Sequence, residues 1–204
     1  MRYLLLVALL LAAGCSGIAD YTEIRAPQTD AEWREFNEHK LRVDRVWGRV
    51  ATTNRDLCGK NCTPHITIGP APGVVAVSGT DGRQEHIRMS FPMLRLLDDD
   101  DRLAALMAHE WSHILLRHRR ADGPRIGELL METQADCVGV MLATRAGYRS
   151  DAMRANLVRS TFGTFLGWQT NAPGRLAGAG RAATAAQGRT ITRETIRQIC
   201  GVAP

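Results

Sequence analysis

The stretch of sequence that decides the fold runs from Leu103 to His113 and reads LAALMAHEWSH. Two histidines four residues apart lie on one face of a helix, about one turn from each other. Their imidazole nitrogens can therefore reach one Zn²⁺ at about 2.0–2.1 Å. Glu110 points to the side of that face, where it can take a proton from a water on the metal. We therefore predict that His109 and His113 bind zinc and that Glu110 is catalytic.

The alternative for this pair is two core histidines, or a chance H-E-x-x-H match. Burying two imidazoles and a carboxylate without a metal is costly unless each group is hydrogen-bonded. The pattern therefore favours a metal site.

A catalytic zinc site uses three protein ligands and keeps one position open. The helix that we expect from about Glu128 to Arg145, ending at Gly147, offers Glu132 and Asp136 on one face. We predict that Glu132 binds zinc and that Asp136 accepts a hydrogen bond from a ligand imidazole, His109 by preference. Ala135 would let the two helices approach closely. Glu128, one turn earlier, is a competing ligand that we assign to the helix start.

Four acids, Asp98 to Asp101, precede the zinc-binding helix and suit its N-terminus. Basic residues from Arg117 to Arg120 suit its C-terminus, and Gly123-Pro124 would stop it. We therefore predict a helix over 98–120. Calcium binding by the acids is disfavoured, because no glycine-containing loop spaces them as ligands.

The segments before this helix predict one long helix and a small sheet. Thr29 and Glu32 form a capping box that opens a helix to about Arg55. Its predicted buried stripe consists of Trp33, Phe36, Val43, Trp47 and Val50. Residues 65–68, 74–78 and 86–90 are expected strands, with a turn at 80–82. The predicted class is α+β: a minimal zincin-like fold with a small antiparallel sheet packed on the H-E-x-x-H helix and the glutamate helix.

The C-terminal part is less regular in pattern. We expect a helix from near Asp151 to about Phe162 and a short final helix, capped by Thr192 and leading to Cys200. Residues 170–190 are rich in Gly, Ala and Arg, which predicts a flexible loop.

H-E-x-x-H followed by E-x-x-A-D resembles the gluzincin family of HtpX and the CAAX-prenyl endopeptidases, peptidase family forty-eight. The likeness runs from about Val74 to Leu157 and includes Arg117-His118 and the sequence AGY at 146–148. It is greatest to the small bacterial lipoprotein members. The resemblance implies a zinc endopeptidase in which the substrate adds as a strand to the sheet edge. Only eighteen residues separate His113 from Glu132, so the large chambers of the membrane-embedded members are not expected.

In the mechanism that these parts imply, zinc polarises the scissile carbonyl while Glu110 moves a proton from water to the leaving amine. The oxyanion donor stays open among Tyr148, Arg149, Arg154 and the arginines of 170–190. His118 lies five residues beyond His113. We expect it to point away from the zinc face and to have a structural role.

The first residues predict export. Arg2 precedes an apolar stretch, Leu4 to Ala13, that is too short to span a bilayer. The ending AAGC resembles a bacterial lipobox, with Ala12 where the pattern usually has Leu. We therefore expect a signal peptide over 1–14, acylated (palmitate-bearing) Cys15 beginning a linker over 15–28, and a peptidase domain over 29–204. Ser16 implies, by analogy, the periplasmic side of an outer membrane; the alternative is a plain signal peptide.

Four cysteines remain, and an even count in an exported chain predicts disulfides. We favour Cys58–Cys62 and Cys137–Cys200. A second zinc site from Cys58, Cys62 and His65 is an alternative that lacks a fourth ligand.

The positive net charge of +5 comes almost wholly from arginines, which are scattered along the chain with few aromatic residues among them, so we expect no nucleic-acid partner.

The predicted partners are a protein or peptide substrate and a membrane, through the lipid anchor. The predicted activity is zinc-dependent hydrolysis of peptide bonds in unfolded or misassembled envelope proteins, with one Zn²⁺ per chain. The alternatives are a lipoprotein adaptor whose site is masked, for instance by 170–190, and a non-peptidase zinc hydrolase. Deformylases, which also use H-E-x-x-H, need an upstream cysteine motif that is not found.

Overall fold

The computed structural model describes residues 24–58, 63–80, 84–118, 125–156 and 172–202. Its elements, in chain order, are α2 (Asp30–Thr53), a 3-10 turn (Arg55–Leu57), β1 (His65–Gly69), β2 (Ala76–Thr80), β3 (Glu85–Ser90), α3 (Phe91–Leu96), α4 (Asp100–Leu115), α5 (Arg125–Arg145), α7 (Ala172–Ala186) and α8 (Arg193–Cys200). Residues 152–156 are also helical. The chain is mixed α+β, as predicted.

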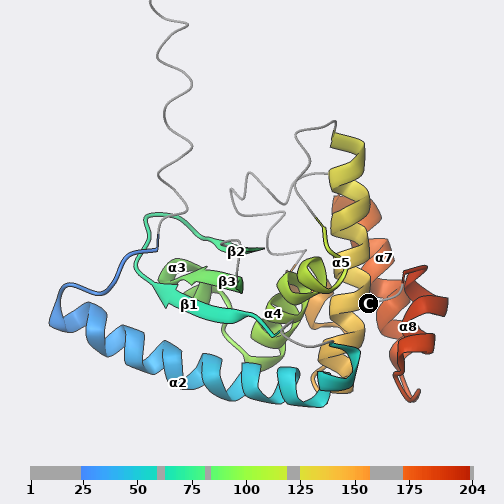
Figure 1. Cartoon of the computed structure of the whole chain (residues 1–204), viewed down its shortest axis with the longest axis horizontal. Helices are drawn as coiled ribbons and strands as arrows, with labels where there is room; N and C mark the ends of the chain where they lie inside the picture. Colours follow the sequence, from blue (N-terminus) through green and yellow to red (C-terminus); the bar gives the residue numbers. More distant parts are fainter. Residues whose placement is uncertain (1–23, 59–62, 81–83, 119–124, 157–171, 203–204) are drawn as a thin grey trace, which may run out of the picture.

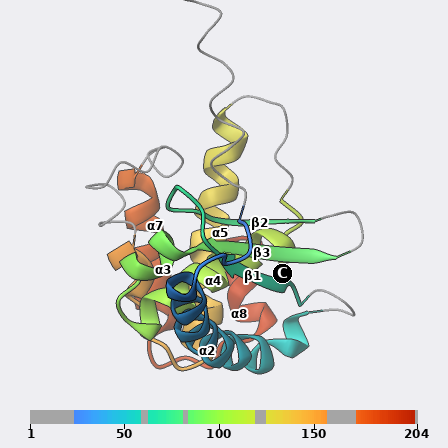
Figure 2. The ribbon, with the colours of Figure 1, turned by 90° about the vertical axis from the view of Figure 1, so that its left-hand side faces the viewer.

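The sheet lies above α2, and α4 runs between the sheet and α5 (Figure 1). Helices α7 and α8 cover the other side of α5. Strand β3 lies in the middle of the three, and the strand order is β1-β3-β2 (Figure 2). Among the described residues, no helix is both long enough and apolar enough to span a membrane.

The expected antiparallel sheet is corrected in one pairing. β2 pairs antiparallel with β3, as a hairpin does, but β1 pairs parallel with β3. The chain reaches β2 from β1 first and returns through the hairpin, so β3 runs in the direction of β1. Both β1 and β2 are therefore edge strands among the described residues.

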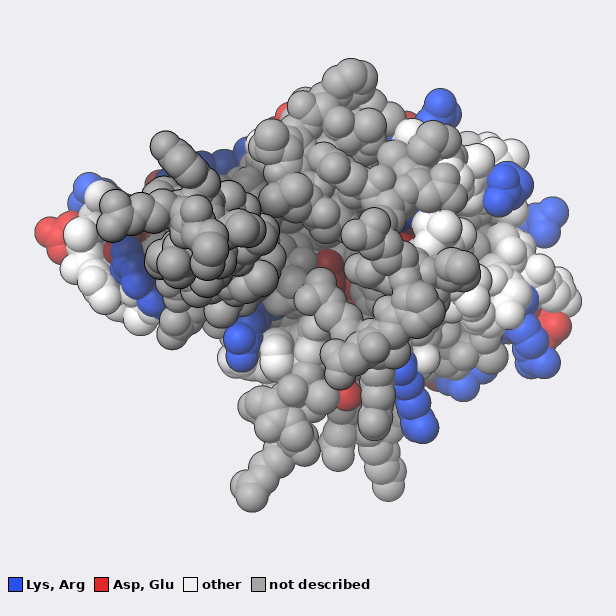
Figure 3. Space-filling model, turned by 90° about the horizontal axis from the view of Figure 1, so that it is seen from above, with Lys and Arg blue, Asp and Glu red and all other residues white. Residues whose placement is uncertain are grey.

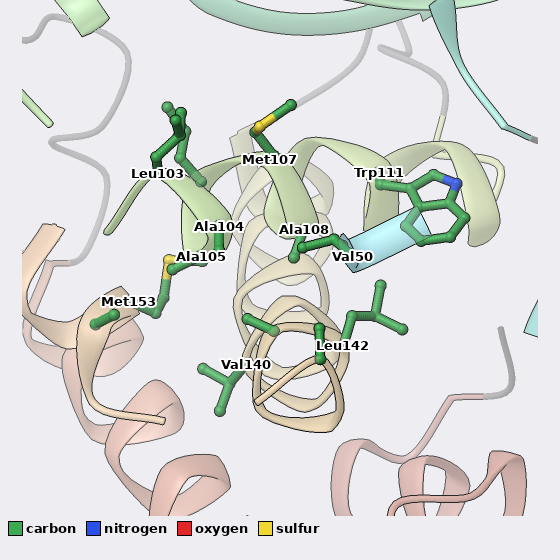
Figure 4. Close-up of a cluster of buried hydrophobic side chains, with 14 of the residues drawn as sticks. Val50, Leu103, Ala104, Ala105, Met107, Ala108, Trp111, Val140, Leu142 and Met153 are labelled. Carbon is green, nitrogen blue, oxygen red and sulfur yellow. The ribbon is translucent and has the colours of Figure 1, made fainter. Parts of the chain in front are cut away.

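The core lies where α4 crosses α5 (Figure 4). Small side chains of α4, Ala104 and Ala108 among them, are fully buried and let the two helices approach. Trp111 is also fully buried and meets Trp47 of α2 edge to face, with 5.1 Å between ring centroids. The x position of the motif that carries Trp111 thus anchors the opposite side of α4.

Helix capping agrees with the sequence at several ends. Thr29, Asp99 and Thr192 each accept a hydrogen bond from a backbone N–H in the first turn of α2, α4 and α8. One residue of the predicted buried stripe is not buried. Trp33 is 47% exposed, because the first turn of α2 projects past the sheet (Figure 1).

Three further segments differ from prediction. Helix α4 ends at Leu115 rather than near Arg120, because Arg117 adopts a positive φ of 55°. Helix α3 was not expected; Ser90 caps it, and a proline lies in its first turn. Residues 172–186 form helix α7 where we predicted a loop. Of the expected helix over 151–162, the residues beyond 156 lie outside the described part of the chain.

Candidate metal centre

Helix α4 brings His109 and His113 together. Their Nε2 atoms are 3.2 Å apart, and the rings meet edge to face at 4.8 Å. Of the two side chains, 2% and 15% are exposed. The four-residue spacing thus turns two nitrogen lone pairs toward one point at the end of the helix.

Glu132 of α5 completes the group. Its Oε2 lies 3.4 Å from Nε2 of His109, and its Oε1 lies 3.5 Å from Nε2 of His113. Two ligands at about 2.0–2.1 Å from a tetrahedral zinc are separated by roughly 3.3 Å. The three observed separations are close to this value, with His109 and His113 facing different oxygens of Glu132, and one ligand atom from each residue lies within 4.8 Å of the others. The donor atoms therefore fit a zinc ion, with the fourth position left for water or substrate.

Close packing of α4 and α5 makes this geometry available. A Cβ atom placed on Gly139 would lie 2.9 Å from both Cα and N of His109, closer than real Cβ contacts occur. Gly139, together with the predicted Ala135, therefore lets the backbone of α5 touch that of α4 beside the first ligand.

Asp136, fully buried on α5, lies where the sequence placed it. Its Oδ1 is 3.0 Å from Nδ1 of His109. With its proton on Nδ1, beside this carboxylate, His109 keeps Nε2 as a lone-pair donor. This position is compatible with the predicted role of Asp136 in orienting His109.

Arg175 of α7 is the residue that sequence reasoning passed over. Its side chain is fully buried and forms two bonds to Asp136, at 2.7 and 2.8 Å. A third contact reaches Oε2 of Glu132 at 3.0 Å. The predicted loop is therefore a helix that delivers one cation to both carboxylates. Arg175 was named only within a group of oxyanion candidates, and here it binds protein groups.

The charges in this cluster favour a cation at its centre. Burial alone would lower the pKa of His109, but hydrogen bonds to Asp136 and Glu132 and their charges raise it to about 10. Burial and the neighbouring charge of His109 lower the pKa of His113 to about 3. The carboxylates thus stabilise one positive charge at this point, and a divalent ion would be stabilised in the same way.

Glu110 lies beside the three donors, 5% exposed. Burial raises its pKa to about 7, against the charge of His109 and hydrogen bonds from Ser78 of β2, which lower it. A carboxylate in this range can take up and return a proton near neutral pH. β2 therefore fixes the group that we predicted to be catalytic.

His118 is not one of the three residues that could hold a metal ion, but it does not turn away from them. Its Nδ1 lies 3.0 Å from Nδ1 of His113, and its Nε2 lies 3.2 Å from Oε1 of Gln134. The expected orientation assumed that α4 continued, and the helix ends before His118.

The other oxyanion candidates with described contacts are bound elsewhere. Arg149 pairs with Asp101, at 2.8 Å. The ring of Tyr148 lies 5.0 Å from the guanidinium of Arg49. Arg154 is exposed, and the side chain of Glu128 lies outside the described residues. The oxyanion donor stays unassigned.

The structure has the disulfide Cys137–Cys200, which joins α5 to α8. Cys58 is disulfide-bonded as well, which disfavours the alternative zinc site with His65. Cys62, the signal segment 1–14 and Cys15 lie outside the described residues.

An H-E-x-x-H helix crossed by a glutamate helix, beneath a small sheet, resembles the arrangement of the zincin class of metallopeptidases. The model of peptidase family M48 matches residues 72–123, which supports the peptidase family predicted from the sequence. The match covers about a quarter of the chain and includes the histidines and Glu110, whereas Glu132 follows it. No curated protein matches the chain closely.

Proposed function

We propose that this protein is an active zinc-dependent metalloendopeptidase, with His109, His113 and Glu132 as ligands. The observation that carries the proposal is the set of three donor separations, 3.2, 3.4 and 3.5 Å, with the buried Glu110 beside them. The match to peptidase family M48 supports the reaction class.

Each residue of the site has a separate role in peptide hydrolysis. Zinc, when bound, polarises the scissile carbonyl and lowers the pKa of the attacking water. Glu110 takes the proton of that water and passes it to the leaving amine. Burial would raise the pKa of Glu132, but a hydrogen bond from His109 and the positive charges of His109, His113 and Arg175 lower it to about 2 and keep the carboxylate ionised. Asp136 keeps the His109 ring in the tautomer that binds metal.

The substrate class follows from the position of β2. This strand lies at an edge of the sheet and contacts α4, and Ser78 within it hydrogen-bonds Glu110. A peptide that adds to this edge must be extended, because only an extended strand can pair with it. We therefore propose unfolded or misassembled proteins as substrates, and we assign them to the cell envelope on the basis of the export signal predicted from residues 1–14.

The test is the variant Glu110→Gln, measured on the purified protein with unfolded casein. It should keep about one zinc per chain, because Glu110 is not a ligand, and should lose roughly 100-fold or more of its cleavage rate, because the base is gone. Glu38→Gln, on the exposed face of α2, is the matched control and should cleave as the wild type does. Unchanged cleavage by the Glu110 variant would contradict the proposed mechanism.

The adaptor alternative predicts a different pattern in the same assay. A wild type that holds zinc and cleaves no unfolded substrate would favour a protein-binding role. In the view from above, acidic side chains are visible near the centre (Figure 3). The basic side chains of the described residues that are visible in this view lie mainly toward its margin.

We also propose that the chain is a lipoprotein facing the periplasm, anchored through Cys15 to the outer membrane. The support is the AAGC ending of the apolar segment. In cell fractionation, the wild type should sediment with membranes and Cys15→Ser should not, because acyl chains supply the anchor. Equal membrane association of the two proteins would contradict the lipid anchor.

A further inference from the structure

The turn that ends α4 places His118 beside a zinc ligand. The N–H of His118 donates to the carbonyl of His113 at 2.8 Å, and the N–H of Arg117 donates to that of Ile114 at 3.0 Å. With φ of 55° at Arg117, this is a Schellman motif, whose last residue packs against the residue five positions earlier. Backbone geometry therefore fixes the contact between the two imidazoles.

The contact between the two Nδ1 atoms determines which ring nitrogen of each histidine carries the proton. Two Nδ1 atoms 3.0 Å apart form a hydrogen bond only if one carries a proton and the other does not. Nε2 of His113 must offer its lone pair to a metal, so its proton resides on Nδ1 and His118 accepts it. The proton of His118 is then on Nε2, where Oε1 of Gln134 accepts it at 3.2 Å.

We propose that His118 and Gln134 are positioning residues that hold His113 in its metal-binding tautomer and orientation. The inference rests on the metal centre of the proposed function. His118 would accept the Nδ1 proton of His113, as Asp136 accepts that of His109. Both chains of hydrogen bonds end on α5, because Gln134 and Asp136 lie on the helix that carries Glu132. Outer hydrogen bonds of this kind typically contribute about 10- to 100-fold to metal affinity.

The experiment compares two substitutions at one position. His118→Ala removes the acceptor, whereas His118→Asn retains one, because Oδ1 of Asn is attached to Cγ as Nδ1 of His is. His65→Ala, an exposed histidine on β1, is the matched control. The readouts are the zinc Kd from chelator competition, the visible spectrum of the Co²⁺-substituted protein, and the urea unfolding midpoint in EDTA.

We expect His118→Ala to raise the zinc Kd about 10- to 100-fold, while its unfolding midpoint in EDTA stays near that of the wild type. His118→Asn should remain within about threefold of the wild-type Kd, because a neutral hydrogen bond is retained. Gln134→Leu should weaken zinc binding less than His118→Ala does, because it removes only the outer acceptor. The Co²⁺ spectrum should change in the alanine variant and not in the asparagine variant.

Two results would overturn the inference. One is an unchanged zinc Kd in His118→Ala. The other is an equal loss of affinity in the Ala and Asn variants together with an equal loss of stability in EDTA, which would indicate packing at the helix end. A wild type that binds no zinc would instead overturn the metal centre itself, so the two failures are distinguishable.

Discussion

Arg175 is a buried cation that balances two carboxylates of the site. Its fully buried guanidinium lies between the carboxylates of Asp136 and Glu132. Removing one partner of a buried pair leaves the remaining charge without compensation, which costs about 3–5 kcal/mol. Part of that cost should depend on whether zinc is bound, because an ion at the ligands also compensates the charge of Glu132.

Arg175→Met is therefore expected to lower the free energy of unfolding by about 3 kcal/mol in EDTA and by less with saturating zinc. Urea unfolding under both conditions measures the difference. Arg181→Met, an exposed position on the same helix, is the control and should have little effect. Equal losses in EDTA and in zinc would show that Arg175 acts through packing alone.

At the same scale, the inner residues of the site could be predicted because their spacing is local. Glu110 and the histidines lie within one turn, and Glu132 and Asp136 are one turn apart on the next helix. Arg175 lies far along the chain, and no local pattern links it to the acids. His118 was misplaced because its position depends on the positive φ of Arg117, a position where glycine is the usual sequence signal.

At the scale of elements, the crossing of α4 and α5 at Gly139 is the contact that sets the ligand geometry. An alanine there must push the helices apart by displacing the backbone of His109, which lies 2.9 Å from the added Cβ. Overpacking of this kind costs about 1–3 kcal/mol, which exceeds the gain in helix propensity.

Gly139→Ala should therefore destabilise the protein by about 1–2 kcal/mol and weaken zinc binding. Gly48→Ala in α2 is the control. No atom lies within 4 Å of its added Cβ, so it should stabilise by about 0.5–1 kcal/mol. Urea unfolding and zinc titration of both variants test this. The prediction is wrong if Gly139→Ala binds zinc as tightly as the wild type.

Helix α7 explains why a composition-based prediction failed. Its buried face consists mainly of alanines, Ala179, Ala182, Ala183 and Ala186, rather than of large apolar residues. Their three- and four-residue spacing is a helical pattern that was present in the sequence. The high Gly and Ala content was interpreted as flexibility, whereas small residues let α7 pack closely on α5.

For the whole molecule, the disulfide Cys137–Cys200 joins α5, the helix that carries Glu132, to α8 across 63 residues. In the chain-entropy account, a loop of this size stabilises the fold by about 4 kcal/mol. The double variant Cys137→Ala, Cys200→Ala should lose about 2–5 kcal/mol in urea unfolding. An unchanged unfolding midpoint would contradict this role.

The arrangement of the whole sheet could not be predicted from its strands. The strand segments themselves were identified, and the antiparallel pairing of β2 with β3 follows from the short stretch of sequence that separates them. The parallel pairing of β1 with β3 depends on where the chain enters the sheet, a long-range property that strand periodicity does not contain.

The turn after α4 also affects how fast an ion could leave. Helix ends open more readily than helix centres, at a fraction of the global unfolding free energy. The hydrogen bond from the N–H of His118 to the carbonyl of His113 closes the last turn of α4. If that turn opened, the imidazoles of His113 and His118 would lose their fixed positions together. The residence time of a bound ion would then follow the opening frequency of a single turn, and amide hydrogen exchange at His118 would report that frequency.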